Sequence, residues 1–150
     1  MYIARTAFLL AALVHTAACA AELELDLGNY AAAVLANSPT PFVVELYSSK
    51  CGACKEFAPT WHAFAGALAG AETAGALKLA RVNMDSKAGA QLASSFPKLL
   101  EAGIPQVVYL PNDDANAPKR YTTLPGKTVG ALTAALRTPA LALAPGGGEL

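Results

Sequence analysis

The stretch FVVELYSSKCGACKEFAPTW, residues 42–61, joins a strand pattern to a helix pattern, and the junction carries Cys51 and Cys54. Residues 42–47 form a nearly continuous apolar run with β-branched and aromatic side chains, which is typical of a strand covered on both faces. After Cys51, large apolar residues recur at helical spacing and predict a helix of about 18 residues, kinked at Pro59. These apolar residues are Phe57, Trp61, Phe64 and Leu68.

The Cys51–Cys54 pair has three interpretations: a metal site, a structural disulfide and a redox couple. A zinc site needs four ligands, and the other candidates are His62 and scattered carboxylates, without a second C-x-x-C. A structural disulfide is a poor interpretation because closing so short a loop restricts the unfolded chain little. The spacing therefore favours a pair that opens and closes, and C-x-x-C after a strand is typical of a thioredoxin-like redox motif.

Strand-like and helix-like segments alternate along the rest of the chain. The expected strands span 23–27, 77–85, 104–110 and 119–124, and the expected helices span 29–38, 87–96 and 128–137. The last two strands flank a turn-rich segment and should pair as a hairpin, whereas strands separated by helices imply parallel crossovers. We therefore expect an α/β fold with a mixed central sheet flanked by helices on both faces. The proline- and glycine-rich residues 139–150 should be a disordered tail.

The N-terminal residues 1–20 have the pattern of a secretory signal peptide. Arg5 precedes an apolar run, and small residues end in the A-x-A pattern Ala18-Cys19-Ala20, which predicts cleavage after Ala20. One alternative is an uncleaved anchor helix, for which the apolar run is short. The other is lipidation at Cys19, which lacks the usual preceding leucine. Cleavage after Ala20 would leave only the Cys51–Cys54 pair.

Length and charge narrow the class of protein. A chain of 150 residues suits one domain with its own core. Eleven basic and eleven acidic residues give zero formal net charge, without runs of like charge, which argues against nucleic acid as a partner. The hydrophobic fraction of 54% is raised by alanine. After residue 20 no stretch approaches the roughly 18 to 20 apolar residues of a membrane span.

The residues around the cysteines resemble the active-site segment of the protein disulfide isomerase family, whose domains have the thioredoxin fold. The family's acid, lysine and Ala-Pro pair recur here as Glu45, Lys55 and Ala58-Pro59. The motifs YSSxCGxC and FAPTW are also similar to the thioredoxin domain of quiescin-type sulfhydryl oxidases, although no counterpart of their flavin-binding domain is found in this sequence.

The resemblance extends toward the C-terminus. GIPQVVYL, residues 103–110, is similar to the family's cis-proline loop and the strand after it. APKRYTTLPGKTVGAL, residues 117–132, resembles the last strand and helix. The similarity covers roughly residues 22–138, which we interpret as one thioredoxin-like domain over 21–138.

The resemblance implies a role for each site residue. Cys51 would be the nucleophile and Cys54 the resolving cysteine, and Glu45 would be a buried acid that carries a proton to or from Cys54. Without the resemblance, Glu45 could equally be a solvent-facing charge on an edge strand. The start of a helix favours negative charge at Cys51, and so does the neighbouring Lys50. Extended client backbone would bind at Ile104 and Pro105, with Pro105 in cis, and beside Lys50.

The expected partners are cysteine-containing unfolded or misfolded client proteins, with an upstream thiol oxidase or glutathione as the redox partner. No cofactor is needed. The expected location is the lumen of the endoplasmic reticulum or the outside of the cell. The final residues GGEL share only the last two letters of the retention signal K-D-E-L. His62, on the opposite side of the helix from the apolar residues, should be a solvated surface residue.

Three departures from the family pattern leave a second function open. Lys50 replaces the usual tryptophan, the spacer is Gly-Ala instead of Gly-His, and the segment FPKLLEAGIP, residues 96–105, is longer than the usual link to the cis proline. The alternative is therefore a non-catalytic thioredoxin-like module that binds clients as a chaperone.

Overall fold

The computed structural model describes residues 22–37, 39–96, 98–112 and 120–142. The strands are β1 (Leu23–Glu24), β2 (Phe42–Tyr47), β3 (Lys78–Asn83), β4 (Gln106–Leu110) and β5 (Thr122–Thr123). The helices are α1 (Tyr30–Ala33), α2 (Gly52–Thr73), α3 (Lys87–Ser94) and α4 (Val129–Ala142), with short 3-10 turns η1 (Leu35–Asn37) and η2 (Leu99–Ala102). This order confirms the predicted α/β fold.

The five strands form one mixed sheet in the order β1-β3-β2-β4-β5. β3 is parallel to both β1 and β2, whereas β4 is antiparallel to β2 and β5, so the predicted hairpin between the last two strands is confirmed. β2 lies at the centre, where Glu45 has Arg81 of β3 on one side and Val107 of β4 on the other. Because side chains alternate along a strand, successive residues of β2 face opposite layers.

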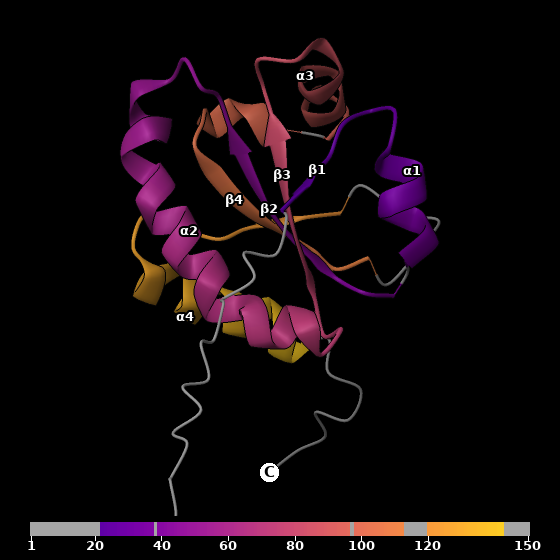
Figure 1. Ribbon diagram of the computed structural model, residues 1–150, viewed down its shortest axis with the longest axis vertical. Coiled ribbons are helices and arrows are strands. Elements are labelled where there is room, and N and C mark those ends of the chain that lie inside the picture. The colour runs from indigo at the N-terminus through magenta and orange to yellow at the C-terminus, as the bar shows by residue number, and fades with distance from the viewer. Residues whose placement is uncertain (1–21, 38, 97, 113–119, 143–150) are drawn as a thin grey trace, which may run out of the picture.

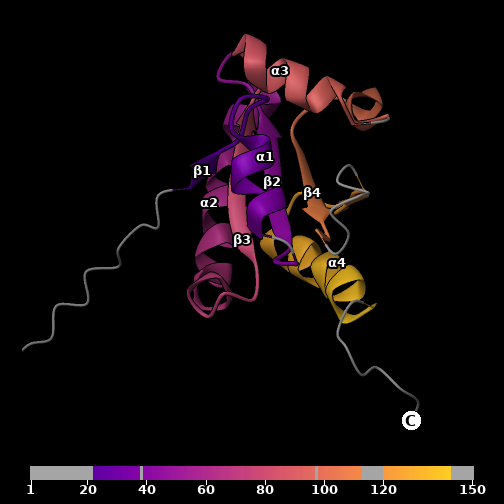
Figure 2. The same ribbon diagram turned by 90° about the vertical axis from the view of Figure 1, so that its right-hand side faces the viewer.

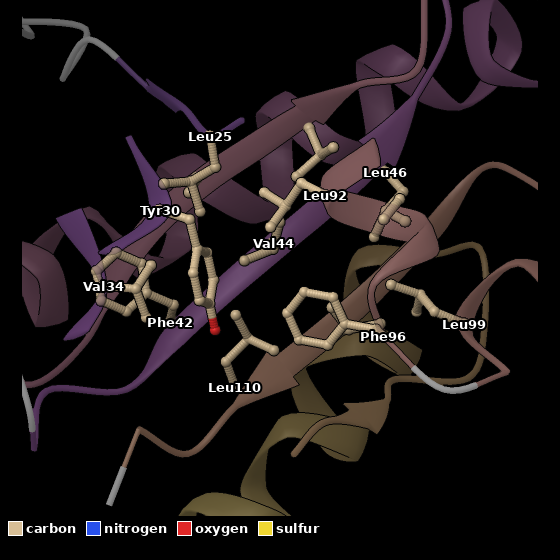
Figure 3. Close-up of a cluster of buried hydrophobic side chains, with 14 residues drawn as sticks. Leu25, Tyr30, Val34, Phe42, Val44, Leu46, Leu92, Phe96, Leu99 and Leu110 are labelled. Carbon is tan, nitrogen blue, oxygen red and sulfur yellow. The ribbon is translucent and has the colours of Figure 1, made fainter. Parts of the chain in front are cut away.

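One face of the sheet is covered by α1 and α3, and the other by α2 and α4 (Figure 1). In the view turned by 90°, α1 lies in front of the strands (Figure 2). The layer beneath α1 and α3 is an apolar cluster in which Tyr30 meets Phe96 edge to face at 5.8 Å between ring centroids (Figure 3). Phe42, Val44 and Leu46 of β2 belong to this cluster.

The opposite layer is built around α2. Its Phe57, Trp61 and Phe64 are buried against Val43 of β2, as their spacing predicted, together with Leu132 of α4. The same layer also receives a charge, because Glu45 follows Val43 by two residues and therefore faces the same side. Glu45 is completely buried.

Several elements differ in length from their predicted spans. β1 ends at Glu24 because Asp26 closes a turn, its Oδ1 accepting hydrogen bonds from the amides of Gly28 and Asn29. α2 is 22 residues long, and Pro59 lies within it. α4 extends to Ala142, into the stretch for which disorder was expected, while residues 143–150 lie outside the described part of the chain.

Candidate redox site

The loop between β2 and α2 is held by one carboxylate from the neighbouring strand connection. Asp85 Oδ1 accepts a hydrogen bond from Ser48 Oγ at 2.7 Å, and Asp85 Oδ2 accepts from both the amide and the hydroxyl of Ser49, each at 2.7 Å. These hydrogen bonds lower the pKa of Asp85. Ser48 Oγ in turn accepts from the Lys50 amide at 3.1 Å. The residues that precede Cys51 are thus fixed from the end of β3.

Cys51 occupies the N-cap position of α2, where serine, threonine, aspartate or asparagine is usual. Its Sγ accepts a hydrogen bond from the Cys54 amide at 3.1 Å, one of the amides without a partner inside the helix. The Cys51 thiol also donates to the carbonyl oxygen of Ile104 at 3.9 Å. Cys51 is half-buried and Cys54 is buried, and both are free thiols.

The Ile104–Pro105 peptide bond is cis, as predicted. The segment before it contains η2, and Gln106 of β4 holds Leu99 and Gly103 of this segment. The Gln106 side-chain amide donates to the Leu99 carbonyl at 2.8 Å and to the Gly103 carbonyl. The backbone of Ile104 is therefore held beside Cys51.

Glu45 is paired with a cation that the sequence analysis did not identify. Its Oε2 lies 2.7 Å from Nε of Arg81, the residue beside it in β3, while its Oε1 contacts no hydrogen-bonding partner among the described residues. Burial raises the pKa of Glu45, and the charge and hydrogen bond of Arg81 oppose this effect. The Arg81 guanidinium also lies 3.8 Å from the ring centroid of Tyr47. Glu45 is therefore a carboxyl whose proton is retained to higher pH than usual.

Cys54 is the more protected thiol. Burial raises its pKa to about 11, with further contributions from the hydrogen bond to Cys51 and from the charges of Cys51 and Glu45, while the Ser48 backbone opposes the shift. At neutral pH the Cys54 thiol is therefore held mainly in its protonated form. Cys54 therefore needs a base before it can attack another sulfur, and the charge of Glu45 acts directly on it.

The site thus combines a dithiol at a helix N-terminus, a cis-proline loop and a buried acid, all on one mixed sheet. The thioredoxin family model matches residues 22–125. The chain belongs to the thioredoxin family. No curated protein matches the sequence of this thioredoxin domain.

Solved structures with the same fold include domains of larger proteins. The Trx4 domain of ERdj5 is 19% identical. The match covers 82% of this chain and 98% of the Trx4 chain, with a TM-score of 0.62. The first thioredoxin domain of mouse protein disulfide-isomerase A4 is 23% identical. The match covers 85% of this chain and 81% of the mouse domain's chain, with a TM-score of 0.59. The structure of the first two thioredoxin domains of Naumovozyma dairenensis Eps1p is 18% identical. The match covers 81% of this chain and 42% of the Eps1p chain, with a TM-score of 0.61.

The structure of this thioredoxin domain brings the predicted residues Cys51, Cys54, Ile104 and Pro105 together at one end of the sheet, with Glu45 behind them in the core. Lys50 is exposed next to Cys51, and its charge also acts on Asp85. Lys127 lies with Pro105 and Gln106 around a shallow pocket.

Three residues of the site were missed. Arg81 had a signal, since it is a cation between the buried apolar residues Ala80 and Val82 of a strand. Asp85 had a weaker one, because it follows β3 and parallel strands end at the same edge. Gln106 had none.

Within residues 22–37, 39–96, 98–112 and 120–142, no three histidine, cysteine, aspartate or glutamate side chains are grouped so that they could hold a metal ion. Over the same residues, none of the helices has both the length and the apolar character of a membrane span.

Proposed function

We propose that this chain is a thiol–disulfide oxidoreductase of the protein disulfide isomerase type, which forms, reduces or shuffles disulfides in cysteine-containing client proteins. The arrangement around one sulfur carries the proposal. Cys51 Sγ accepts the Cys54 amide and lies 3.9 Å from the carbonyl oxygen of Ile104, next to the cis Pro105. A client strand bound along the Ile104–Pro105 edge would bring its disulfide to this sulfur.

The first step is the attack of the Cys51 thiolate on a client disulfide. The client S–S bond breaks, a bond forms between Cys51 and one client sulfur, and the other client sulfur leaves as a thiolate that takes a proton from water. The amides at the start of α2 stabilise the negative sulfur, since the N-terminus of a helix favours negative charge.

The second step resolves this mixed disulfide. Cys54 transfers its proton to the Glu45 carboxylate, and the resulting thiolate attacks Cys51 Sγ. The mixed disulfide breaks and the second client sulfur leaves as a thiolate. The client has then gained two electrons, and Cys51 and Cys54 form a disulfide that two molecules of reduced glutathione return to the dithiol. Client oxidation follows the same steps in reverse.

The decisive experiment is the reduction of insulin disulfides by the purified chain with glutathione as the reductant. We expect turnover well above the uncatalysed rate, loss of turnover in Cys51→Ser, and accumulation of a mixed disulfide in Cys54→Ser. Ser94→Ala, a change at an exposed serine of α3 away from this loop, is the control, and it should retain turnover. A rate equal to the uncatalysed one would instead support the client-binding module.

The location is part of the same proposal. The N-terminal pattern supports a signal peptide that is cleaved after Ala20. It also supports a location in the lumen of the endoplasmic reticulum or outside the cell. Expression in a secretory host and sequencing of the mature N-terminus test it. A chain that begins at Ala21 is the expected product, and retention of residues 1–20 would contradict the proposal.

A further inference from the structure

The buried pair of Glu45 and Arg81 continues to the surface through two more side chains. Arg81 Nε lies 3.4 Å from Glu22 Oε2, and Glu22 Oε1 lies 3.5 Å from His62 Nδ1. The exposed fraction of the side chain rises from 0% at Glu45 to 17% at Arg81, 20% at Glu22 and 59% at His62. These four residues, here called the charge row, lead from the core to the solvent.

We propose that Glu22 and His62 are positioning residues that act through Arg81 to control how strongly Glu45 holds its proton, and with it the pH range in which Cys54 resolves a mixed disulfide. This inference rests on the proposed function and concerns the regulation of the same site.

The geometry makes Arg81 a shared cation. Its Nε is 2.7 Å from Glu45 and 3.4 Å from Glu22, so one positive charge serves two carboxylates. The edge strand β1 places Glu24 beside Arg81 in register, and Glu22, two residues earlier, faces the same side. Glu24 is engaged elsewhere, because its Oε1 accepts a hydrogen bond from the Tyr47 hydroxyl at 2.7 Å. Of these two acids, Glu22 is therefore the one that competes with Glu45 for Arg81.

The sign of each effect on Glu45 follows from the charges that face it: Arg81 from β3, Glu22 from the start of the β1 segment, and His62 and Cys54 from α2. Burial is the main cause that raises the pKa of Glu45, the charge of Glu22 raises it further, and Arg81 and His62 lower it. Positive charge on His62 lies against Glu22, and it would hold Glu22 and leave Arg81 to Glu45. The charge row would thus keep Glu45 ionised, and able to accept a proton from Cys54, at lower pH than burial alone would allow.

The test is the rate of mixed-disulfide resolution from pH 5 to pH 9, followed in single turnovers with a fluorogenic glutathione disulfide. The acidic limb of this profile reports the ionisation of the base. In Glu22→Gln we expect that limb to move to lower pH by about half a unit, because Arg81 then serves Glu45 alone. In His62→Gln, a change at an exposed position that should not impair folding, the limb should move to higher pH by about 0.3 unit.

The matched control is Glu56→Gln, which removes the same charge from an exposed position on the helix that carries His62. Its profile should superimpose on that of the parent chain. An unmoved or upward-shifted limb in Glu22→Gln, or an equal shift in Glu56→Gln, would overturn the inference while leaving the proposed function intact. Absence of turnover in the parent chain would instead remove the proposed function itself.

Discussion

The two faces of the sheet are built differently. The face beneath α1 and α3 holds an apolar cluster of leucine, valine and aromatic side chains (Figure 3). The face beneath α2 and α4 is equally well buried but also contains the carboxyl of Glu45, and in the described part of the chain both Glu45 Oε1 and Trp61 Nε1 are buried without a hydrogen-bond partner. One strand, β2, supplies both faces by alternation.

The difference concerns Glu45 and Arg81, because both faces hold a buried apolar cluster and only the face beneath α2 and α4 also holds this ion pair. A buried charge is costly even when paired, and an apolar substitute of similar volume is often at least as stable. Glu45 and Arg81 are therefore poorly explained as stabilising elements. Their proposed role in the ionisation of Cys54 would explain them, and the following predictions separate the two faces.

The largest expected effect is on the apolar face. Phe42→Ala should lower the free energy of unfolding by about 3 to 5 kcal/mol, because it removes a fully buried ring and leaves a cavity. Urea unfolding at pH 5 and pH 8 measures it, and the loss should be equal at both pH values, since no titrating group is removed. A loss of stability that differs between pH 5 and pH 8 would contradict the prediction that the apolar face contains no titrating group that affects stability.

Arg81→Met should weaken the other face in a manner that does depend on pH. At pH 8 the loss should be about 3 kcal/mol, because Glu45 is left as a buried charge without its cation. The folded-state pKa of Glu45 is already raised by burial and would rise further. A group with a raised folded-state pKa contributes stability that is present below its unfolded pKa and is lost as the pH rises through the folded one. The loss should therefore be smaller at pH 5, and equal losses at both values would contradict the assignment.

Glu45→Gln should separate chemistry from stability. The fold should remain, with a melting temperature close to that of the parent, because the amide that replaces the carboxylate carries no charge and Arg81 keeps Glu22 as an acidic partner. Resolution of the mixed disulfide at pH 7 should slow about a hundredfold, equivalent to about 2.7 kcal/mol of barrier. Quenched-flow trapping of the mixed disulfide gives the rate, with Glu56→Gln as the control. An unchanged rate from pH 6 to pH 8 would show that Glu45 does not carry the proton.

The smallest expected effect is at the surface of the site. Lys50→Trp removes an exposed cation next to Cys51, and Coulomb attraction at such a position is on the order of 1 kcal/mol or less. Asp85 shares the charge of Lys50, which reduces the effect on Cys51 further. The alkylation rate of Cys51 should therefore fall less than tenfold at low salt and hardly at all at high salt. A faster alkylation in Lys50→Trp at low salt would show that the charge does not act on this sulfur.

Much of the fold could be predicted because its signals are local. The apolar run of β2, the helical spacing in α2 and the proline after Ile104 each specify structure within a few residues. The short strands could not be delimited. β1 depends on pairing with β3, far along the chain, and only Thr122 and Thr123 of the last predicted strand pair with β4. α4 was predicted too short because Pro139 was read as an end, although the helix continues past it.

The site residues also divide into those that a local sequence motif identifies and those that depend on contacts between distant segments. Cys51, Cys54 and Glu45 could be identified from one segment, whereas their roles remain predictions. Arg81, Asp85 and Gln106 contact residues that lie 36, 37 and 7 positions away in the chain. The first contact joins β3 to β2 and the second joins the segments that follow these two strands, and no sequence pattern specifies the register of the two strands. Glu22 and His62 are further examples, because each looks like an ordinary surface residue until Arg81 is placed between Glu45 and the N-terminal segment.

The hydrogen bond at the N-cap of α2 makes the charge on Cys51 accessible to measurement. Because Cys51 Sγ accepts the amide of Cys54, that hydrogen bond becomes charge-assisted whenever the sulfur is a thiolate, and charge-assisted bonds are shorter and stronger. The amide proton of Cys54 is therefore an internal spectroscopic probe of the charge on Cys51. Its chemical shift and its exchange with solvent should follow the ionisation and the oxidation of that sulfur, without a label, a substrate or a substitution.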